Sequence, residues 1–345
     1  MKQQAKLIHY IFLVGEVIVG ILFVMAIVFL LNFMTGIMNP QVVPTGWKII
    51  RPPDEVSALI IDNDTVWTGG KNGLILINRN QSSQIPKPAG TPQFGFVHAL
   101  LKDHTDAMWV AHDGGLACYR NGAWNTVSGA PFRRALSLLE DRQGRIWVGS
   151  DAMVAYYDGK SWMTESPADG MRLASIDVLY EDHNGTIWMG CSAPSNAGLY
   201  KLNGTSWRYY SVEDGLPHQT VRAISQSRNG TIWIATGFSN NGGLVEVKDG
   251  NWTVSTTHEG LAGNVTRSVY EDRSGRIWVG SEYDGMVVFD HGKRHILTTK
   301  EGLAGNEVKV MAEDDNGVFW LGTSGGLTRI ESSFLFANCS CPERI

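Results

Sequence analysis

The stretch Asp141–Ser150 reads DRQGRIWVGS, and Asp272–Ser281 reads DRSGRIWVGS, which differs at a single position. Both copies contain a segment close to the form (I/V)-W-(V/I/M)-(G/A). That segment recurs around seven tryptophans, Trp67, Trp109, Trp147, Trp188, Trp233, Trp278 and Trp320. The repeat length is roughly 40 residues, and its parts carry strand and turn signals without helical spacing, which is typical of a propeller. The sequence therefore predicts an all-β, seven-bladed β-propeller.

One full repeat, Asn264–Gly305, shows the expected blade. A strand near Val265–Glu271 ends in a turn, a second strand carries Ile277–Val279, and a third covers Met286–Phe289 before a further turn opens the fourth. Glycine, aspartate and asparagine separate these strands, as short antiparallel hairpins require. Four strands of this kind make one blade.

The ends of the repeat array predict how the ring closes. The last repeat lacks a fourth strand that starts with tryptophan, whereas Thr45–Ile50 resembles Thr205–Tyr210, a fourth strand of another repeat. We therefore predict that Trp47–Arg51 completes the seventh blade and removes an exposed sheet edge. Phe334–Phe336 is the competing segment. The propeller is assigned to residues 47–330 and a C-terminal tail to residues 331–345.

The N-terminal segment differs from the repeats. Tyr10–Leu31 is apolar apart from Glu16, and Lys2 and Lys6 precede it. That length can span a bilayer, and the lysines favour a cytoplasmic N-terminus over residues 1–9. A cleaved signal peptide is the alternative, but its apolar region is shorter and ends at a small-residue site. We expect one transmembrane helix within residues 10–36, a linker at 37–46, and a single-pass protein whose propeller is periplasmic or extracellular.

Composition excludes several classes of protein. The formal charge of −5 gives no basis for a nucleic-acid partner. The four cysteines are too few and too unevenly spaced for a disulfide framework or a zinc site. Asp182–Gly185 lacks the later ligands of a calcium loop, and His291 and His295 lie in a hairpin that we expect to be solvated. No metal or cofactor is predicted.

The repeated aspartates and tryptophans are expected to be structural. An aspartate that opens a turn bonds its own backbone, and a tryptophan repeated seven times packs between blades more readily than it forms a unique site. Known catalytic motifs are absent from the sequence.

Loops on one face of the ring vary from blade to blade. Strand alternation places the turns after first and third strands on one face, and these turns are monotonous. The loops after second strands and the blade connections lie on the other face and vary, which is where binding usually occurs. This variable face carries His112–Asp113 and four residues taken as candidate ligand contacts, Asn196, Asn241, Tyr283 and Asp284.

One position of the inner strands also varies. It lies five residues before the residue that ends each strand and is occupied by Ser57, His98, Leu136, Asp177, Arg222, Arg267 and Lys309. The next position is always small, as packing near the axis requires. Where a position differs from blade to blade while its neighbours repeat, packing does not dictate the residue. We therefore take His98, Asp177, Arg222, Arg267 and Lys309 as candidate ligand contacts. Solvated charge at a channel mouth is the alternative. Three cations against one carboxylate would suit an anionic or polyhydroxylated ligand.

The repeats resemble those of the two-component regulator propeller family. The pattern of that family, D-x-x-G-x-(I/L)-W-(V/I)-G-T-x-x-G-L, is matched nearly throughout by Asp314–Leu327. Its G-L-x-x-N connector is matched at Gly260–Asn264 and Gly302–Asn306. The resemblance implies a propeller like those in extracytoplasmic sensor regions of bacterial histidine kinases, some of which respond to glycans. No kinase module follows residue 330, so enzymatic signalling is not carried over.

Three functional hypotheses remain at this point. The first is a ligand-binding or sensor propeller that recognises a small molecule or glycan and signals to a protein partner. The second is a protein–protein interaction platform. The third is a lyase or glycosidase-like enzyme. His258 and Glu259 are a weak candidate pair for a lyase, and the spacing of Asp and Gly differs from the aspartate box of sialidases.

Overall fold

The computed structural model describes residues 43–167, 173–192 and 197–336, together with six positions near the N-terminus. Those six, Ile18, Gly20, Phe23, Val24, Met25 and Ile27, are helical and, apart from Gly20, are exposed apolar side chains. Most of the segment predicted to form a transmembrane helix thus lies outside the described residues. In the described part of the chain, no helix is long and apolar enough to cross a membrane.

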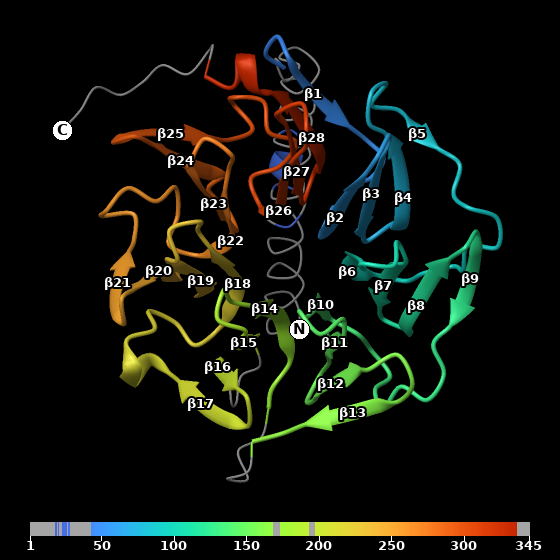
Figure 1. The fold of residues 1–345 in the computed structure, drawn as a ribbon. Helices are drawn as coiled ribbons and strands as arrows, with labels where there is room; N and C mark the ends of the chain where they lie inside the picture. The colour runs from blue at the N-terminus through green and yellow to red at the C-terminus, as the bar shows by residue number, and fades with distance from the viewer. Residues whose placement is uncertain are drawn as a thin grey trace, which may run out of the picture. The chain divides into compact units, whose positions relative to one another are not determined.

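Residues 43–345 form a compact unit of their own. Within it, the described residues make seven four-stranded antiparallel sheets arranged in a ring (Figure 1). Blades 1 and 2 comprise β2 (Ala58–Asp62), β3 (Thr65–Gly70), β4 (Gly73–Asn78) and β5 (Gln84–Ile85), then β6 (Val97–Lys102), β7 (Met108–His112), β8 (Gly115–Arg120) and β9 (Ala123–Thr126). Blades 3 and 4 comprise β10 (Ser137–Glu140), β11 (Ile146–Gly149), β12 (Val154–Tyr157) and β13 (Trp162–Glu165), then β14 (Ile176–Glu181), β15 (Ile187–Cys191), β16 (Gly198–Asn203) and β17 (Ser206–Tyr210).

Blades 5 and 6 comprise β18 (Val221–Gln226), β19 (Ile232–Phe238), β20 (Asn241–Lys248) and β21 (Asn251–Ser255), then β22 (Thr266–Glu271), β23 (Ile277–Ser281), β24 (Met286–Asp290) and β25 (Lys293–Leu297). Blade 7 comprises β26 (Val308–Glu313), β27 (Val318–Thr323), β28 (Gly326–Glu331) and β1 (Trp47–Ile50). The first strand of each of blades 1 to 6, and β26 of blade 7, lies nearest the axis. The predicted seven-bladed β-propeller is confirmed.

The ring closes through pairing between the two ends of the propeller. Strand β1 pairs antiparallel with β28, with Trp47 opposite Ile330, so the segment predicted for this place does form the outer strand of blade 7. Phe334 lies instead in a short 3-10 turn, Ser332–Phe334, and its carbonyl accepts a hydrogen bond from Trp47 Nε1 at 3.2 Å. Leu335 is buried. Residues 331–336, which we assigned to a tail, are therefore packed against the last blade.

Each signature tryptophan of blades 2 to 7 is bonded to the turn that precedes it. In blade 3, Asp141 Oδ1 accepts the backbone N–H groups of Gln143 and Arg145, and Oδ2 accepts Trp147 Nε1 at 2.6 Å. Asp103, Asp182, Asp272 and Asp314 do the same. In blade 5 the Ser227 hydroxyl accepts Trp233 Nε1, while Asn229 Oδ1 accepts the backbone N–H of Thr231. The structural role expected for these residues is confirmed, and the bond between aspartate and indole is an addition that the sequence did not reveal.

The core lies between blades. Trp278 of blade 6 stacks on Phe319 of blade 7 with ring centroids 4.3 Å apart, and both side chains belong to one buried cluster with residues of β26 and β28. Gly280 permits this approach, because a Cβ there would lie 2.5 Å from the carbonyl oxygen of Val308. Large buried aromatic surface at this interface holds blades 6 and 7 together.

The monotonous face carries a repeated link between blades. At five boundaries, the backbone N–H that follows the turn aspartate, or Ser227 in blade 5, donates to the side chain that ends the next inner strand. The pairs are His104 to Glu140, Arg142 to Glu181, His183 to Gln226, Arg228 to Glu271 and Arg273 to Glu313. Across the seam between blades 7 and 1, Arg79 instead pairs with Asp314 at 2.8 Å. The turns of this face are therefore alike because they share a structural task.

Candidate functional site

Five of the seven inner strands carry a β-bulge at the same place near the variable face. In blade 6, Thr266 pairs with Ser281 and Ser268 pairs with Gly280, so the residue between them, Arg267, has no partner across the sheet. The other bulged residues are His98, Asp177, Arg222 and Lys309. A bulge leaves a residue unpaired and re-aims its side chain, and bulges are common next to functional sites.

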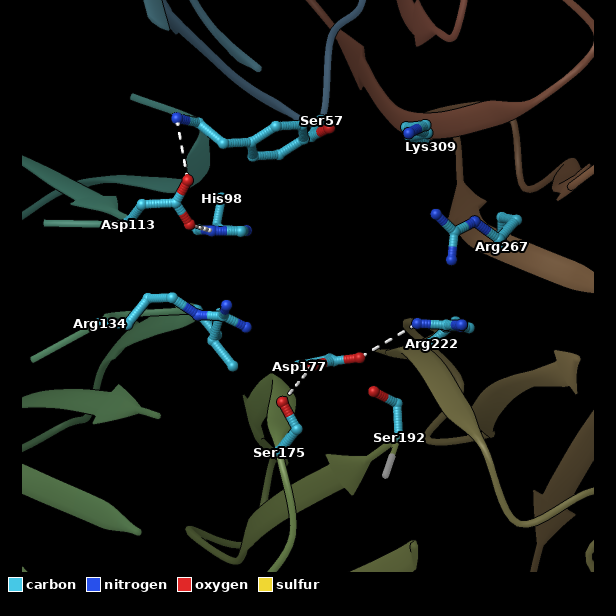
Figure 2. Close-up of a pocket in the computed structure, with 12 residues that line it drawn as sticks. Ser57, His98, Asp113, Arg134, Ser175, Asp177, Ser192, Arg222, Arg267 and Lys309 are labelled. Atoms are coloured by element: carbon cyan, nitrogen blue, oxygen red, sulfur yellow. Dashed lines mark hydrogen bonds and ion pairs between the residues drawn. The ribbon is translucent and has the colours of Figure 1, made fainter. Parts of the chain in front are cut away.

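These residues surround one cavity of about 520 Å³. All seven positions singled out from the inner strands line it, Ser57, His98, Leu136, Asp177, Arg222, Arg267 and Lys309. Figure 2 shows Arg222, Arg267 and Lys309 on one side of this axial cavity, and His98 and Asp113 on the opposite side. The structure thus brings together residues that lie as much as 252 positions apart because each blade contributes one of them.

The candidate ligand contacts chosen from the variable loops do not line this cavity where the structure describes them. Tyr283, Asp284 and Asn241 are exposed and are not among the residues that line the axial cavity. The Tyr283 hydroxyl donates to Glu282 at 3.0 Å, and Asp284 lies near Ser281. Asn196 lies outside the described residues. These three side chains therefore lie outside the wall of the axial cavity, and their contact with a ligand stays a prediction.

Three lining residues were missed by the sequence comparison, Phe96, Arg134 and Ser175. Each lies two positions before a residue that the comparison had singled out. Side chains two apart on an extended chain point the same way, and this period could have found them. Asp113 and Ser192, both from loops after second strands, complete the wall.

Ion pairs connect the cavity wall from blade to blade. Arg222 donates to Asp177 of blade 4 at 3.1 Å, and Arg267 pairs with Glu307 at 2.8 Å. Lys309 reaches both Glu55 at 2.5 Å and Glu307 at 3.4 Å. The sequence comparison counted three cations against one carboxylate, whereas the structure supplies each cation with an acidic partner. The wall is therefore alternately charged.

Burial and neighbouring charges tune two groups of this wall. Burial lowers the pKa of Arg222, and the nearby Arg267 lowers it further, while Asp177 opposes both effects. On the other side, the hydrogen bond from His98 lowers the pKa of Asp113, so this residue stays a carboxylate at neutral pH. The cavity offers fixed charges and hydroxyl groups, an arrangement that can orient a polar ligand.

Other candidates from the sequence have structural explanations. Glu259 accepts the backbone N–H and hydroxyl of Thr256 and so caps a turn, with His258 exposed beside it. His291 is exposed, as expected for a solvated hairpin. His295 is buried and stacks on Phe336 with ring centroids 3.8 Å apart, so the expectation of a solvated side chain was wrong for His295. Among the described residues, no group of three or more His, Cys, Asp or Glu side chains is placed to hold a metal ion.

Seven four-stranded blades around an axial cavity define this chain as a seven-bladed β-propeller. Four of its segments match the family described as "Two component regulator propeller", residues 129–152, 215–238, 260–283 and 302–325. The chain thus carries repeats of this family, and the resemblance seen in the sequence is confirmed. No curated protein matches the chain in sequence.

Solved structures share the fold at low identity. The extracellular domain assigned to the hybrid two component system BT3049 of B. thetaiotaomicron has a TM-score of 0.73 at 18% identity, covering 86% of this chain and 42% of that one. PorZ, a surface component of the type-IX secretion system of Porphyromonas gingivalis, has a TM-score of 0.60 at 17% identity, covering 81% and 46%. Virginiamycin B lyase from Staphylococcus aureus has a TM-score of 0.64 at 11% identity, covering 83% and 98%. This chain spans less than half of the first two proteins.

Proposed function

We propose that this protein is a membrane-anchored, extracytoplasmic sensor-type propeller. It binds a small polar molecule, a glycan or an anionic ligand, in the axial cavity and passes the binding event to a signalling protein partner. The observation that carries the proposal is the set of five bulges that turn chemically different side chains into one cavity. Packing demands alike residues at equivalent positions of a repeat, so this variety indicates a task other than packing.

The location part of the proposal rests on the N-terminal sequence. The apolar segment within residues 10–36 and the lysines before it support an anchor with a cytoplasmic N-terminus. The similar structure from B. thetaiotaomicron is an extracellular domain of a two component system, which supports the same side of the membrane. Protease accessibility of the propeller in spheroplasts tests this part, and protection of the propeller until the cytoplasmic membrane is lysed would refute it.

Ligand binding can be tested on the full chain with a panel of neutral sugars, sugar acids, amino acids and short peptides. We expect one class to raise the thermal unfolding temperature in a saturable way, as a ligand specific for the folded state must. Ser57→Trp should abolish that shift, because the indole would occupy part of the axial cavity. Arg273→Gln is the matched control on the monotonous face, where the Arg273 side chain is half exposed.

A second candidate function is a protein-interaction platform. Phe238, the last residue of β19 in blade 5, and Tyr283, in the β23–β24 loop of blade 6, are 58% and 54% exposed, and both lie on the variable face. Exposed aromatic side chains are frequent anchors at protein interfaces. If no small molecule shifts unfolding, and a partner captured from the cell envelope is lost with Phe238→Ser and Tyr283→Ser, this function replaces the first.

A further inference from the structure

The boundary between blades 5 and 6 differs from the other boundaries on the cationic side of the axial cavity. Ion pairs connect blade 4 to blade 5, through Asp177 and Arg222, and connect blades 6, 7 and 1 through Arg267, Glu307, Lys309 and Glu55. Between blades 5 and 6, two guanidinium groups approach each other instead. Figure 2 shows Arg222 and Arg267 on adjacent strands with both guanidinium groups directed into the cavity.

Both arginines have donor groups left over. Among the described residues, Arg222 makes one ion pair, through Nη1 to Asp177, and Arg267 makes one, through Nη2 to Glu307. A guanidinium carries five N–H donors, so each group can accept a second anionic partner. Lys309 differs because two carboxylates already share its ammonium group.

A protein carboxylate does not fill this position in the described part of the chain. Glu282 of the β23–β24 loop lies close enough to influence Arg222 electrostatically. Its Oε1, however, accepts the Tyr283 hydroxyl at 3.0 Å, and its Oε2 is buried without a hydrogen-bond partner. Glu307 also acts on Arg222 through its charge, but among the described residues its ion pairs are with Arg267 and Lys309. No described carboxylate therefore forms an ion pair with both arginines, which leaves donors of two like charges directed at one place, the arrangement expected of an anion subsite.

The surplus of carboxylates around the cavity disfavours a ligand that carries more than one negative charge. Four cations, Arg134, Arg222, Arg267 and Lys309, are met by six carboxylates, Glu55, Asp113, Asp151, Asp177, Glu282 and Glu307. This set repels a dianion such as phosphate more strongly than a monoanion, and a single carboxylate can offset the repulsion by taking the donors of Arg222 and Arg267 with the bidentate geometry that guanidinium favours.

The rest of the wall suits hydroxyl groups. Ser57, Ser175 and Ser192 supply hydroxyls, and Asp113 and Asp177 supply acceptors within the same cavity. Phe96 adds an aromatic face beside His98, with ring centroids 4.8 Å apart. A volume of about 520 Å³ accommodates a molecule of sugar size.

We infer that Arg222 and Arg267 together bind the carboxylate of a hydroxylated monocarboxylate ligand, a sugar acid, across the boundary between blades 5 and 6. This inference rests on the proposed function, since it names the ligand class of the same cavity. Arg222 and Arg267 determine specificity for the acid over the corresponding neutral sugar.

The test compares two ligands that differ only at C6, the carboxylate of D-galacturonate and the hydroxymethyl group of D-galactose, with inorganic phosphate as a third. Calorimetric titration of the full chain should show galacturonate binding at least tenfold more tightly than galactose, and phosphate binding no better than galactose. Arg267→Gln should remove most of this preference, because glutamine keeps hydrogen-bonding capacity but loses the charge. Arg273→Gln, in the same blade on the opposite face, should leave it unchanged.

The outcomes separate this inference from the proposed function. Equal affinity for the acid and the neutral sugar, tighter binding of phosphate, or a preference that survives Arg267→Gln overturns the carboxylate subsite. In each of these cases ligand binding in the axial cavity still stands if Ser57→Trp abolishes it. If neither the acid, the neutral sugar nor any other ligand of the panel binds, the proposed function fails as well. Arg267→Lys, which restores the charge, should recover part of the preference and so excludes a folding defect.

Discussion

Asp103 joins the turn of blade 2 to its signature tryptophan, and removing its charge should destabilise the propeller measurably. Its Oδ1 accepts Thr105 N at 2.8 Å, Ala107 N at 3.0 Å and the Thr105 hydroxyl at 2.7 Å. Its Oδ2 accepts Trp109 Nε1 at 2.7 Å and Arg120 at 3.1 Å. In Asp103→Asn, one oxygen becomes an amide nitrogen that faces donors, which leaves a buried N–H unsatisfied. We expect a loss of about 2–4 kcal/mol in the free energy of unfolding.

The pH dependence gives an independent magnitude. Burial alone would raise the pKa of Asp103, but hydrogen bonds from Thr105, Trp109 and Ala107 together lower it from 3.8 to about 2. Because the pKa is lower in the folded state, this stability is fully present above pH 3.8 and is lost as the pH falls through 2. The shift corresponds to about 2 kcal/mol at pH 7 and about 1 kcal/mol at pH 3.

Urea unfolding of the full chain at pH 7 and pH 3 measures both effects. The difference between wild type and Asp103→Asn should shrink by about 1 kcal/mol at the lower pH. Asp106→Asn is the matched control, because Asp106 is in the same turn but 84% exposed, and asparagine tolerates its positive φ of 63°. Equal unfolding midpoints for the two variants, or a difference that does not change with pH, would refute the reasoning.

Three further predictions concern packing, ring closure and thiol reactivity. Gly280→Ala should lower the free energy of unfolding by about 1–3 kcal/mol and Gly292→Ala by about 1 kcal/mol, since the Cβ at 280 meets the next blade and the one at 292 meets open space. Thermal unfolding measures both variants, and equal shifts in unfolding temperature would contradict tight packing between blades. Trp47→Ala should cost about 3–5 kcal/mol and expose the closing strand to limited proteolysis, because Trp47 is buried and bonded to Phe334; unchanged protease resistance would count against closure by β1. Burial raises the pKa of Cys191 to about 12, so iodoacetamide at pH 8 should label it only after unfolding, as followed by mass spectrometry; rapid labelling of the folded protein would overturn this burial.

Most of the inner-strand residues that line the axial cavity could be predicted by aligning the repeats of this chain with one another. Aligning the repeats singled out seven positions, from Ser57 to Lys309, and all of them line the cavity. The comparison could not foresee the bulges, because a bulge depends on which residues pair across two strands. It also missed Glu55 and Glu307, whose role follows from their distances to Lys309 and Arg267. Tyr283 and Asn241, chosen because their loops vary, do not line the axial cavity, since the variability of a loop does not fix where its side chains point.

Repetition is what allowed the sequence by itself to determine the fold. Seven copies of a turn followed by a tryptophan strand predict seven blades, since each copy can bury its apolar faces only against the next one. The resemblance of Thr45–Ile50 to an outer strand even indicated where the ring closes.

Only the tertiary structure decided the chemistry of the cavity. Distances between different blades determine which cations are neutralised. They also determine that no described carboxylate forms an ion pair with both Arg222 and Arg267. Such distances arise when the ring closes and brings remote residues together. Local sequence patterns fix conformation over a few residues, whereas the electrostatics of a site depends on the positions of all its charges.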